Sequence, residues 1–153
     1  MLTKSENIPV INMKEVPLDT PGGRIRQARL EKNMFINEVA KQVGITKEAL
    51  SSMERNKITL KLETLKKLSI ILEKPIWYFG CFENLPEVTF GDKIKKARLY
   101  LGLEKGEFAN LFNVDKKSIY NWENDLFKPK NPEFILEAIE IIKKERVNFY
   151  FKT

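Results

Sequence analysis

The chain has 153 residues, of which 42% are hydrophobic, and a net charge of +6, which suits one or two small packed domains with a polyanionic partner. It has no His and a single Cys, which excludes an intrachain disulfide, His-based acid–base catalysis and most zinc sites.

Residues 1–21 are predicted to form an N-terminal arm. Pro9, Pro17 and Pro21 interrupt its short apolar patches. Ile8–Met13 is compatible with a short strand or an extended arm, and a disordered leader is the favoured alternative. The arm has no continuous apolar h-region, and no apolar run in the chain approaches the ~20 residues of a membrane span. We therefore expect no secretory signal, no membrane contact and a cytoplasmic location.

Residues 22–80 predict a first helical domain. Apolar residues at helical spacing, stopped by Gly, Asn or Pro, predict five helices over roughly residues 23–32, 36–43, 47–55, 61–72 and 76–79. Between the second and third helices, Gly44 can take the positive φ of a tight turn, and Thr46 can cap the helix that follows. Helix, Gly-containing turn and helix make a helix-turn-helix unit.

A linker at residues 81–90 is predicted to lead to a second helical domain at residues 91–146, followed by a tail at residues 147–153. Four helices are expected over roughly residues 92–101, 104–112, 116–124 and 133–145. Asn113 stands at the tight turn and Asp115 can cap the third helix. The last helix is apolar around most of its circumference. Beyond it, the alternation of Val147, Phe149 and Phe151 predicts a short strand.

The second domain repeats the first at an offset of 69 residues, without a gap from Ile25/Ile94 to Leu60/Pro129. Identical residues recur at Ala28/Ala97, Arg29/Arg98, Leu30/Leu99, Glu38/Glu107, Ala40/Ala109, Lys47/Lys116 and Glu54/Glu123. Since polar and apolar positions keep one register, chance similarity of two amphipathic domains is the weaker explanation. The predicted fold is all-α, with two tandem four- to five-helix domains joined by a short linker.

Both copies resemble the helix-turn-helix domains of the Cro/phage-repressor (XRE) family, which have a lambda-repressor-like fold. The resemblance rests on Ile25-Arg26, Arg29, Ala40, Gly44-Ile45-Thr46 and Glu54 in the first copy, and on Ile94-Lys95, Arg98, Ala109, Val114, Glu123 and Pro129 in the second. It implies ion pairs across each core, Arg29–Glu54 and Arg98–Glu123. It also implies a sequence-specific regulator of transcription that binds double-stranded DNA, most often a repressor.

The resemblance places the third helix of each copy in the major groove. The implied contact residues are Lys47, Glu48, Ala49, Ser51 and Ser52 in the first copy and Lys116, Lys117, Ser118, Tyr120 and Asn121 in the second. Candidates for phosphate contacts are Lys57, Lys105 and Lys128, and for any single Lys a solvated surface charge is the alternative. Long side chains that carry hydrogen-bond donors are more frequent among the contact residues of the second copy, so we expect the second copy to be the better reader of DNA.

The first copy departs from the family where its second helix begins. Phe35 and Ile36 stand where the family has Ser or Thr followed by a Gln that touches DNA. A protein partner at Phe35 and Ile36 is therefore possible, and the alternative function is a protein-interaction module such as an antitoxin-like or anti-repressor partner.

The apolar last helix and tail predict a homodimer in which this surface is buried against a second copy. The alternative is that the N-terminal arm of the same chain covers the surface. The sequence shows no nucleophile–base pair, metal-ligand cluster or phosphate-binding Gly loop. We therefore expect no enzyme activity, no cofactor and no metal.

Overall fold

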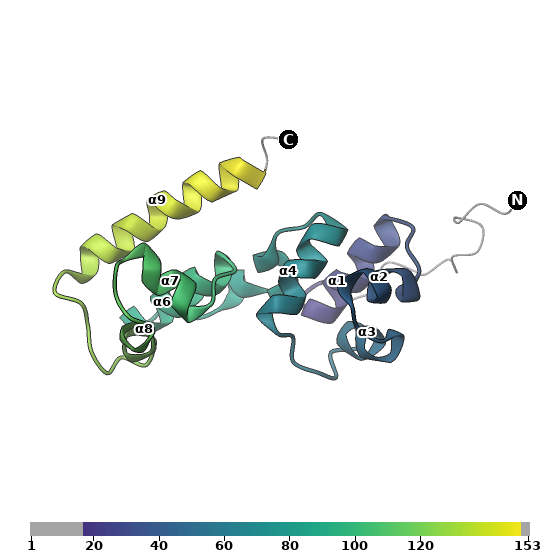
Figure 1. Cartoon of the computed structure of the whole chain (residues 1–153), viewed down its shortest axis with the longest axis horizontal. Coiled ribbons are helices and arrows are strands. Elements are labelled where there is room, and N and C mark those ends of the chain that lie inside the picture. Colours follow the sequence, from purple (N-terminus) through teal and green to yellow (C-terminus); the bar gives the residue numbers. More distant parts are fainter. Residues whose placement is uncertain (1–16, 151–153) are drawn as a thin grey trace, which may run out of the picture. The chain divides into compact units, whose positions relative to one another are not determined.

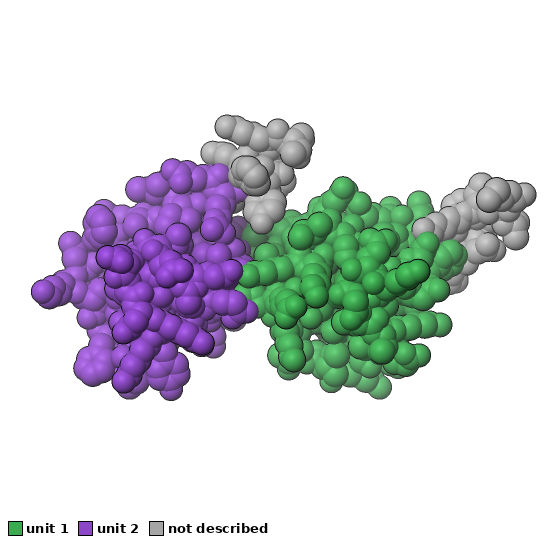
Figure 2. Space-filling model, viewed as in Figure 1, with its two compact units in different colours: residues 1–81 green, residues 82–153 purple. Residues whose placement is uncertain are grey.

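The computed structural model describes residues 17–150, the last four of them as helical backbone only. Every regular element in this range is a helix, which confirms the predicted all-α fold (Figure 1). The chain divides into two compact units, unit 1 up to Cys81 and unit 2 from Phe82 onward (Figure 2). The predicted strand or arm at Ile8–Met13 lies outside the described residues.

From residue 17 onward, unit 1 contains five helices, α1 (Pro21–Glu31), α2 (Ile36–Val43), α3 (Lys47–Glu54), α4 (Leu62–Leu72) and α5 (Ile76–Gly80). α1 packs on α3 and α5, and α2 packs on α3 and α4. Its largest fully buried side chains include Ile25, Leu50, Leu68 and Phe79. α1 begins two residues before the predicted start, because the Thr20 hydroxyl accepts a hydrogen bond from the Gly23 N–H and Pro is favoured in a first helical turn.

Unit 2 contains the short 3-10 helix η3 (Phe82–Asn84) and four α-helices, α6 (Phe90–Tyr100), α7 (Lys105–Leu111), α8 (Lys116–Glu123) and α9 (Pro132–Tyr150). α8 packs on α6 and α7, while α9 packs mainly on α6. Ile94, Phe108, Ile119 and Ile139 lie at the centre of this core. η3 also packs on α6, where Lys96 Nζ donates to the Glu83 carbonyl at 2.8 Å. Part of the segment expected to be a linker therefore belongs to unit 2.

The long helix α9 corrects the prediction of a short strand after residue 146. Val147–Tyr150 continue the helix, and Phe151 lies outside the described residues. No Gly or Pro follows Ile142. Extending an existing helix adds one hydrogen bond per residue without a new nucleation cost, so three alternating apolar residues do not suffice to end it.

Candidate nucleic-acid interface

In unit 1 a tight turn sets the angle between α2 and α3. Gly44 ends α2 with φ of 82°, and the N–H groups of Gly44 and Ile45 both donate to the Ala40 carbonyl, at 2.9 and 3.0 Å. Ala40 is buried, and its small side chain lets the two helices approach closely. The Thr46 hydroxyl then accepts from the Ala49 N–H at 3.0 Å and caps α3 as predicted.

Unit 2 builds the same turn from different residues. Asn113 takes the left-handed conformation with φ of 52°, and the Val114 N–H donates to the Ala109 carbonyl at 3.1 Å. Asp115 Oδ1 accepts from the Ser118 hydroxyl at 2.8 Å and from the Ser118 N–H at 2.7 Å. These two hydrogen bonds, the one from the hydroxyl first, hold the pKa of Asp115 below its ordinary value because they stabilise the ionised carboxylate.

A glycine at the start of the first helix of each unit contacts the end of the exposed third helix. A Cβ on Gly22 would lie 2.4 Å from the Met53 carbonyl oxygen. In unit 2, a Cβ on Gly91 would lie 2.6 Å from the Glu123 carbonyl oxygen. Only glycine permits this approach, which fixes the C-terminal ends of α3 and α8 against α1 and α6.

The same glycines donate to a side chain just beyond the third helix. The Gly22 N–H donates to Asn56 Oδ1 and the Gly91 N–H to Asp125 Oδ1, both at 2.8 Å. The pKa of Asp125 is held below its ordinary value by the Thr89 side chain first and the Gly91 N–H second. The two contacts are again 69 positions apart.

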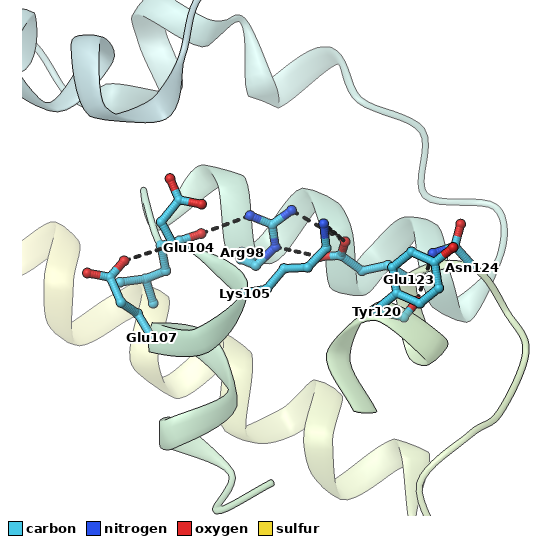
Figure 3. A network of polar contacts seen from close by, with 8 residues as sticks. Arg98, Glu104, Lys105, Glu107, Tyr120, Glu123 and Asn124 are labelled. Atoms are coloured by element: carbon cyan, nitrogen blue, oxygen red, sulfur yellow. Dashed lines mark hydrogen bonds and ion pairs between the residues drawn. The ribbon is translucent and has the colours of Figure 1, made fainter. Parts of the chain in front are cut away.

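Each unit has a buried ion pair between its first and third helices. Arg29 Nε lies 2.6 Å from Glu54 Oε1, and Arg98 Nε lies 2.5 Å from Glu123 Oε1 (Figure 3). The guanidinium groups also donate to backbone carbonyls, Arg29 to Met34 at 3.0 Å and Arg98 to Leu103 at 2.9 Å. These bonds offset the cost of removing the charges from water.

Every residue expected to contact DNA has solvent access. The exposed ones are Lys47, Glu48 and Lys57 in unit 1 and Lys116, Lys117, Tyr120 and Lys128 in unit 2. The partly exposed ones are Ala49, Ser51 and Ser52 in unit 1 and Lys105, Ser118 and Asn121 in unit 2. The outward side of α8 thus joins two lysines, a phenol and an amide on one surface.

Lys105 has a partner within its own unit that the sequence did not indicate. Its Nζ lies 3.8 Å from Glu123 Oε2, beside the Arg98 pair (Figure 3). The position equivalent to Lys105 in unit 1 is Ile36, which is partly buried, as is Phe35. A phosphate bound at the start of α7 would therefore compete with Glu123 for the charge of Lys105. In unit 1 the equivalent residue is Ile36, which is not a cation.

Two further exposed cations border these surfaces. Arg55 follows α3 directly, where its Nε donates to the Ser51 carbonyl at 3.2 Å, and Lys130 lies in the loop after α8. Neither was among the predicted contact residues. A search for every basic residue in the loop after the third helix would have found both.

The helix-turn-helix family profile matches residues 25–78, which lie in unit 1. The chain is also 42% identical over 103 residues to the HTH-type transcriptional regulator SinR of Bacillus subtilis (strain 168), across 62% of this chain and 91% of that protein. The chain belongs to the XRE-type helix-turn-helix family of transcriptional regulators. It is therefore a DNA-binding protein, and its relatives are regulators rather than enzymes.

A second relative of this XRE-type regulator is SinR of Bacillus licheniformis, 42% identical over 53 residues that cover 34% of this chain and 48% of that protein. The similarity to the Bacillus subtilis protein covers 62% of this chain, which is about 95 of its 153 residues. Because unit 1 ends at Cys81, a match of this length extends over part of both units. No solved structure matches the chain significantly.

None of the helices in the described part of the XRE-type regulator is long and apolar enough to cross a membrane. Among the same residues, no three His, Cys, Asp or Glu side chains are grouped so that they could hold a metal ion.

Proposed function

We propose that the protein is a sequence-specific repressor with two tandem copies of the helix-turn-helix domain, which read the major groove with α3 and α8. The observation that carries the proposal is the recurrence in unit 2 of each contact that fixes the third helix in unit 1. The turn, the glycine contact and the ion pair recur at an offset of 69 residues. Repression rather than activation rests on the resemblance to phage repressors.

Unit 2 is proposed to be the better reader of DNA. The first turn of α8 presents Lys116 and Lys117, whereas the first turn of α3 pairs Lys47 with Glu48, whose carboxylate repels phosphate. Further along α8, Asn121 can form two hydrogen bonds with an adenine edge. Because released counterions supply a large share of protein–DNA affinity, a surface with more lysines and no acid among the contact residues is expected to bind more strongly.

The proposed assembly is a two-fold homodimer through α9. One face of this helix, with Ile135 and Ile139, is buried in unit 2. The adjacent face leaves Phe134 and Ile141 exposed by 61% and 58%. Burying such a face against a second copy removes apolar surface from water, and isologous contacts are the commonest closed assembly.

Phe35 and Ile36 support a second candidate function, binding to a protein partner. Both are partly exposed at the start of α2, where the family touches DNA. An apolar surface there favours a protein over a phosphate backbone, since phosphate needs hydrogen-bond donors. Unit 1 would then bind a regulatory protein while unit 2 binds DNA.

Selection of bound fragments from a random duplex library tests the main proposal. We expect one enriched sequence motif, together with an affinity that falls linearly with salt on logarithmic axes because bound phosphates release counterions. Absence of an enriched motif, with binding that salt does not weaken, would favour the protein-interaction function. The Lys116→Ala and Lys117→Ala variants should each reduce the salt slope. Lys67→Ala serves as the matched control, because this exposed lysine on α4 lies outside the proposed contact residues and outside α9.

A further inference from the structure

Two large apolar side chains are exposed in the loop that follows α8. Leu126 is 59% exposed and Phe127 is 68% exposed. They are consecutive, and the exposed Lys128 and Lys130 follow them closely. Single exposed apolar residues are common, whereas an adjacent Leu and Phe beside the surface proposed to read DNA are placed where they can contact the same partner.

The backbone holds this pair at a fixed position relative to α8. The Leu126 N–H donates to the Asn121 carbonyl at 2.9 Å. The Asn124 side chain donates to the Tyr120 carbonyl at 2.7 Å (Figure 3), and Asp125 accepts from the Gly91 N–H. At its other end, the loop is held by Asn131 Oδ1, which accepts from the Phe134 N–H at 3.1 Å. The loop thus presents Leu126 and Phe127 from a backbone anchored at both ends.

Unit 1 has the same backbone with different side chains. There the Lys57 N–H donates to the Ser52 carbonyl at 2.9 Å, so Lys57 matches Leu126 and Ile58 matches Phe127. A lysine at this position suits contact with a phosphate, whereas leucine and phenylalanine cannot donate to one. The two units therefore offer different chemistry at equivalent places.

We propose that Leu126 and Phe127 form an apolar wedge that enters the minor groove of the bound duplex and partly unstacks a base step. This inference rests on the proposed DNA binding by unit 2. α8 has eight residues and is about 12 Å long, similar to the width of the major groove. With the start of α8 at the base edges, the loop beyond its end reaches the phosphate backbone that separates the major groove from the minor groove.

Charge around the pair favours DNA over an apolar protein surface. Lys128 and Lys130 can hold the phosphates on either side of the widened groove, and these two cations outnumber the one carboxylate that directly precedes the pair, Asp125, which accepts from the Gly91 N–H. Apolar wedges of this kind kink a duplex by about 20–90° toward the major groove. The wedge would make the affinity depend on a deformable base step that no hydrogen bond reads.

The test uses the full chain and the duplex obtained by selection. The duplex carries a donor and an acceptor dye at its ends and 2-aminopurine at each step flanking the motif in turn. We expect the parent protein to shorten the distance between the dyes and to raise the 2-aminopurine fluorescence at one step. Phe127→Ala should lose both signals and bind roughly three- to tenfold more weakly, because the cost of unstacking offsets most of the gain from burial.

Matched variants separate the wedge from other roles. Val88→Ala removes a more exposed apolar side chain, 86% accessible, before α6, and should keep both signals. Lys128→Ala should reduce the salt slope, whereas Phe127→Ala should leave it unchanged because it removes no phosphate contact.

Three results would contradict the proposal, and each points to a different cause. If Phe127→Ala bends the duplex as the parent does, or if the parent binds a straight duplex, the wedge is wrong while DNA binding stands. If Phe127→Ala instead lowers the sedimentation mass of the free protein, the pair belongs to an interface between copies and the wedge is likewise wrong. If the parent selects no duplex at all, the proposed function fails first.

Discussion

Arg98 and Glu123 meet in the core of unit 2 with side chains only 6% and 4% exposed, and the pair joins α6 to α8. Arg29 and Glu54 join α1 to α3 in the same way. A desolvated pair of this kind contributes modest net stability when intact, but it leaves an uncompensated charge when one partner is removed.

Arg98→Ala is therefore expected to lower the free energy of unfolding by roughly 3–5 kcal/mol, because the buried Glu123 would lose its hydrogen-bonded partner and keep only the longer 3.8 Å contact with Lys105. Chemical denaturation followed by the fluorescence of Trp122 in a Trp77→Phe background reports on unit 2 alone. Glu140→Ala is the control, since it breaks a pair between the exposed Glu140 and Lys143 on α9 of the same unit and should have little effect. An Arg98→Ala midpoint equal to that of the parent would show that the pair is not desolvated in solution.

Replacing glycine by alanine should have opposite effects on the free energy of unfolding at two positions of unit 2. Gly91→Ala would force a Cβ within 2.6 Å of the Glu123 carbonyl oxygen, and we expect a loss of roughly 1–3 kcal/mol. Gly106→Ala on α7 meets nothing within 4 Å and should stabilise the unit by about 0.5–1 kcal/mol, because alanine loses less backbone entropy in a helix. Thermal melts of both variants measure the difference. Equal effects would contradict the close approach of α6 and α8.

Acid should weaken unit 2 through two caps that unit 1 builds from neutral residues. Thr46 and Asn56 of unit 1 correspond to Asp115 and Asp125, whose pKa values are lowered in the folded protein by hydrogen bonds. A lowered folded pKa gives stability that is complete above the unfolded value of about 3.9 and is lost as the pH falls through the folded pKa.

The test of these caps is a double variant, Asp115→Asn with Asp125→Asn. Its free energy of unfolding should lie furthest below that of the parent above about pH 5, and the difference should shrink as the pH falls below about 4. Denaturant titrations at several pH values, with Trp122 as the probe, measure it. A difference that stays constant with pH would show that the two carboxylates keep ordinary pKa values.

Alanine substitutions of the proposed contact residues should weaken DNA binding more in unit 2 than in unit 1. Lys117→Ala and Asn121→Ala should each weaken specific binding by about 1–3 kcal/mol, and Glu48→Ala and Ser52→Ala by less. Fluorescence anisotropy with the selected duplex measures the losses, and a scrambled duplex separates base reading from general attraction. Larger losses from the unit 1 variants would reverse the assignment of the better reader.

Self-association should depend on the exposed face of α9. Ile141→Glu is expected to convert a dimer to a monomer in sedimentation experiments, because a charge in an apolar interface loses its hydration. Ile70→Glu is the matched control: Ile70 is exposed on α4 of unit 1 and lies outside the proposed interface. A parent chain that remains monomeric at high micromolar concentration would leave the proposed dimer without support.

The sequence by itself determined the features that depend on neighbouring residues. The turns at Gly44 and Asn113 and the caps at Thr46 and Asp115 follow from the conformations and acceptors that these residues provide. The all-α class followed from helical periodicity, and the family followed from side chains that recur at a fixed spacing. The prediction of a strand after residue 146 was wrong, because it rested on too few residues to stop a helix already formed.

Only the tertiary structure decided which distant surfaces meet. No local pattern indicated that Gly91 lies against the end of α8, that Glu123 is shared between Arg98 and Lys105, or that α9 buries Ile139 and leaves Ile141 exposed. Each depends on the packing of helices far apart in the chain. Many residues of α9 are apolar enough to be buried, so the sequence does not specify which face of α9 packs against α6. That face is determined by shape complementarity, which acts only when the helices are assembled.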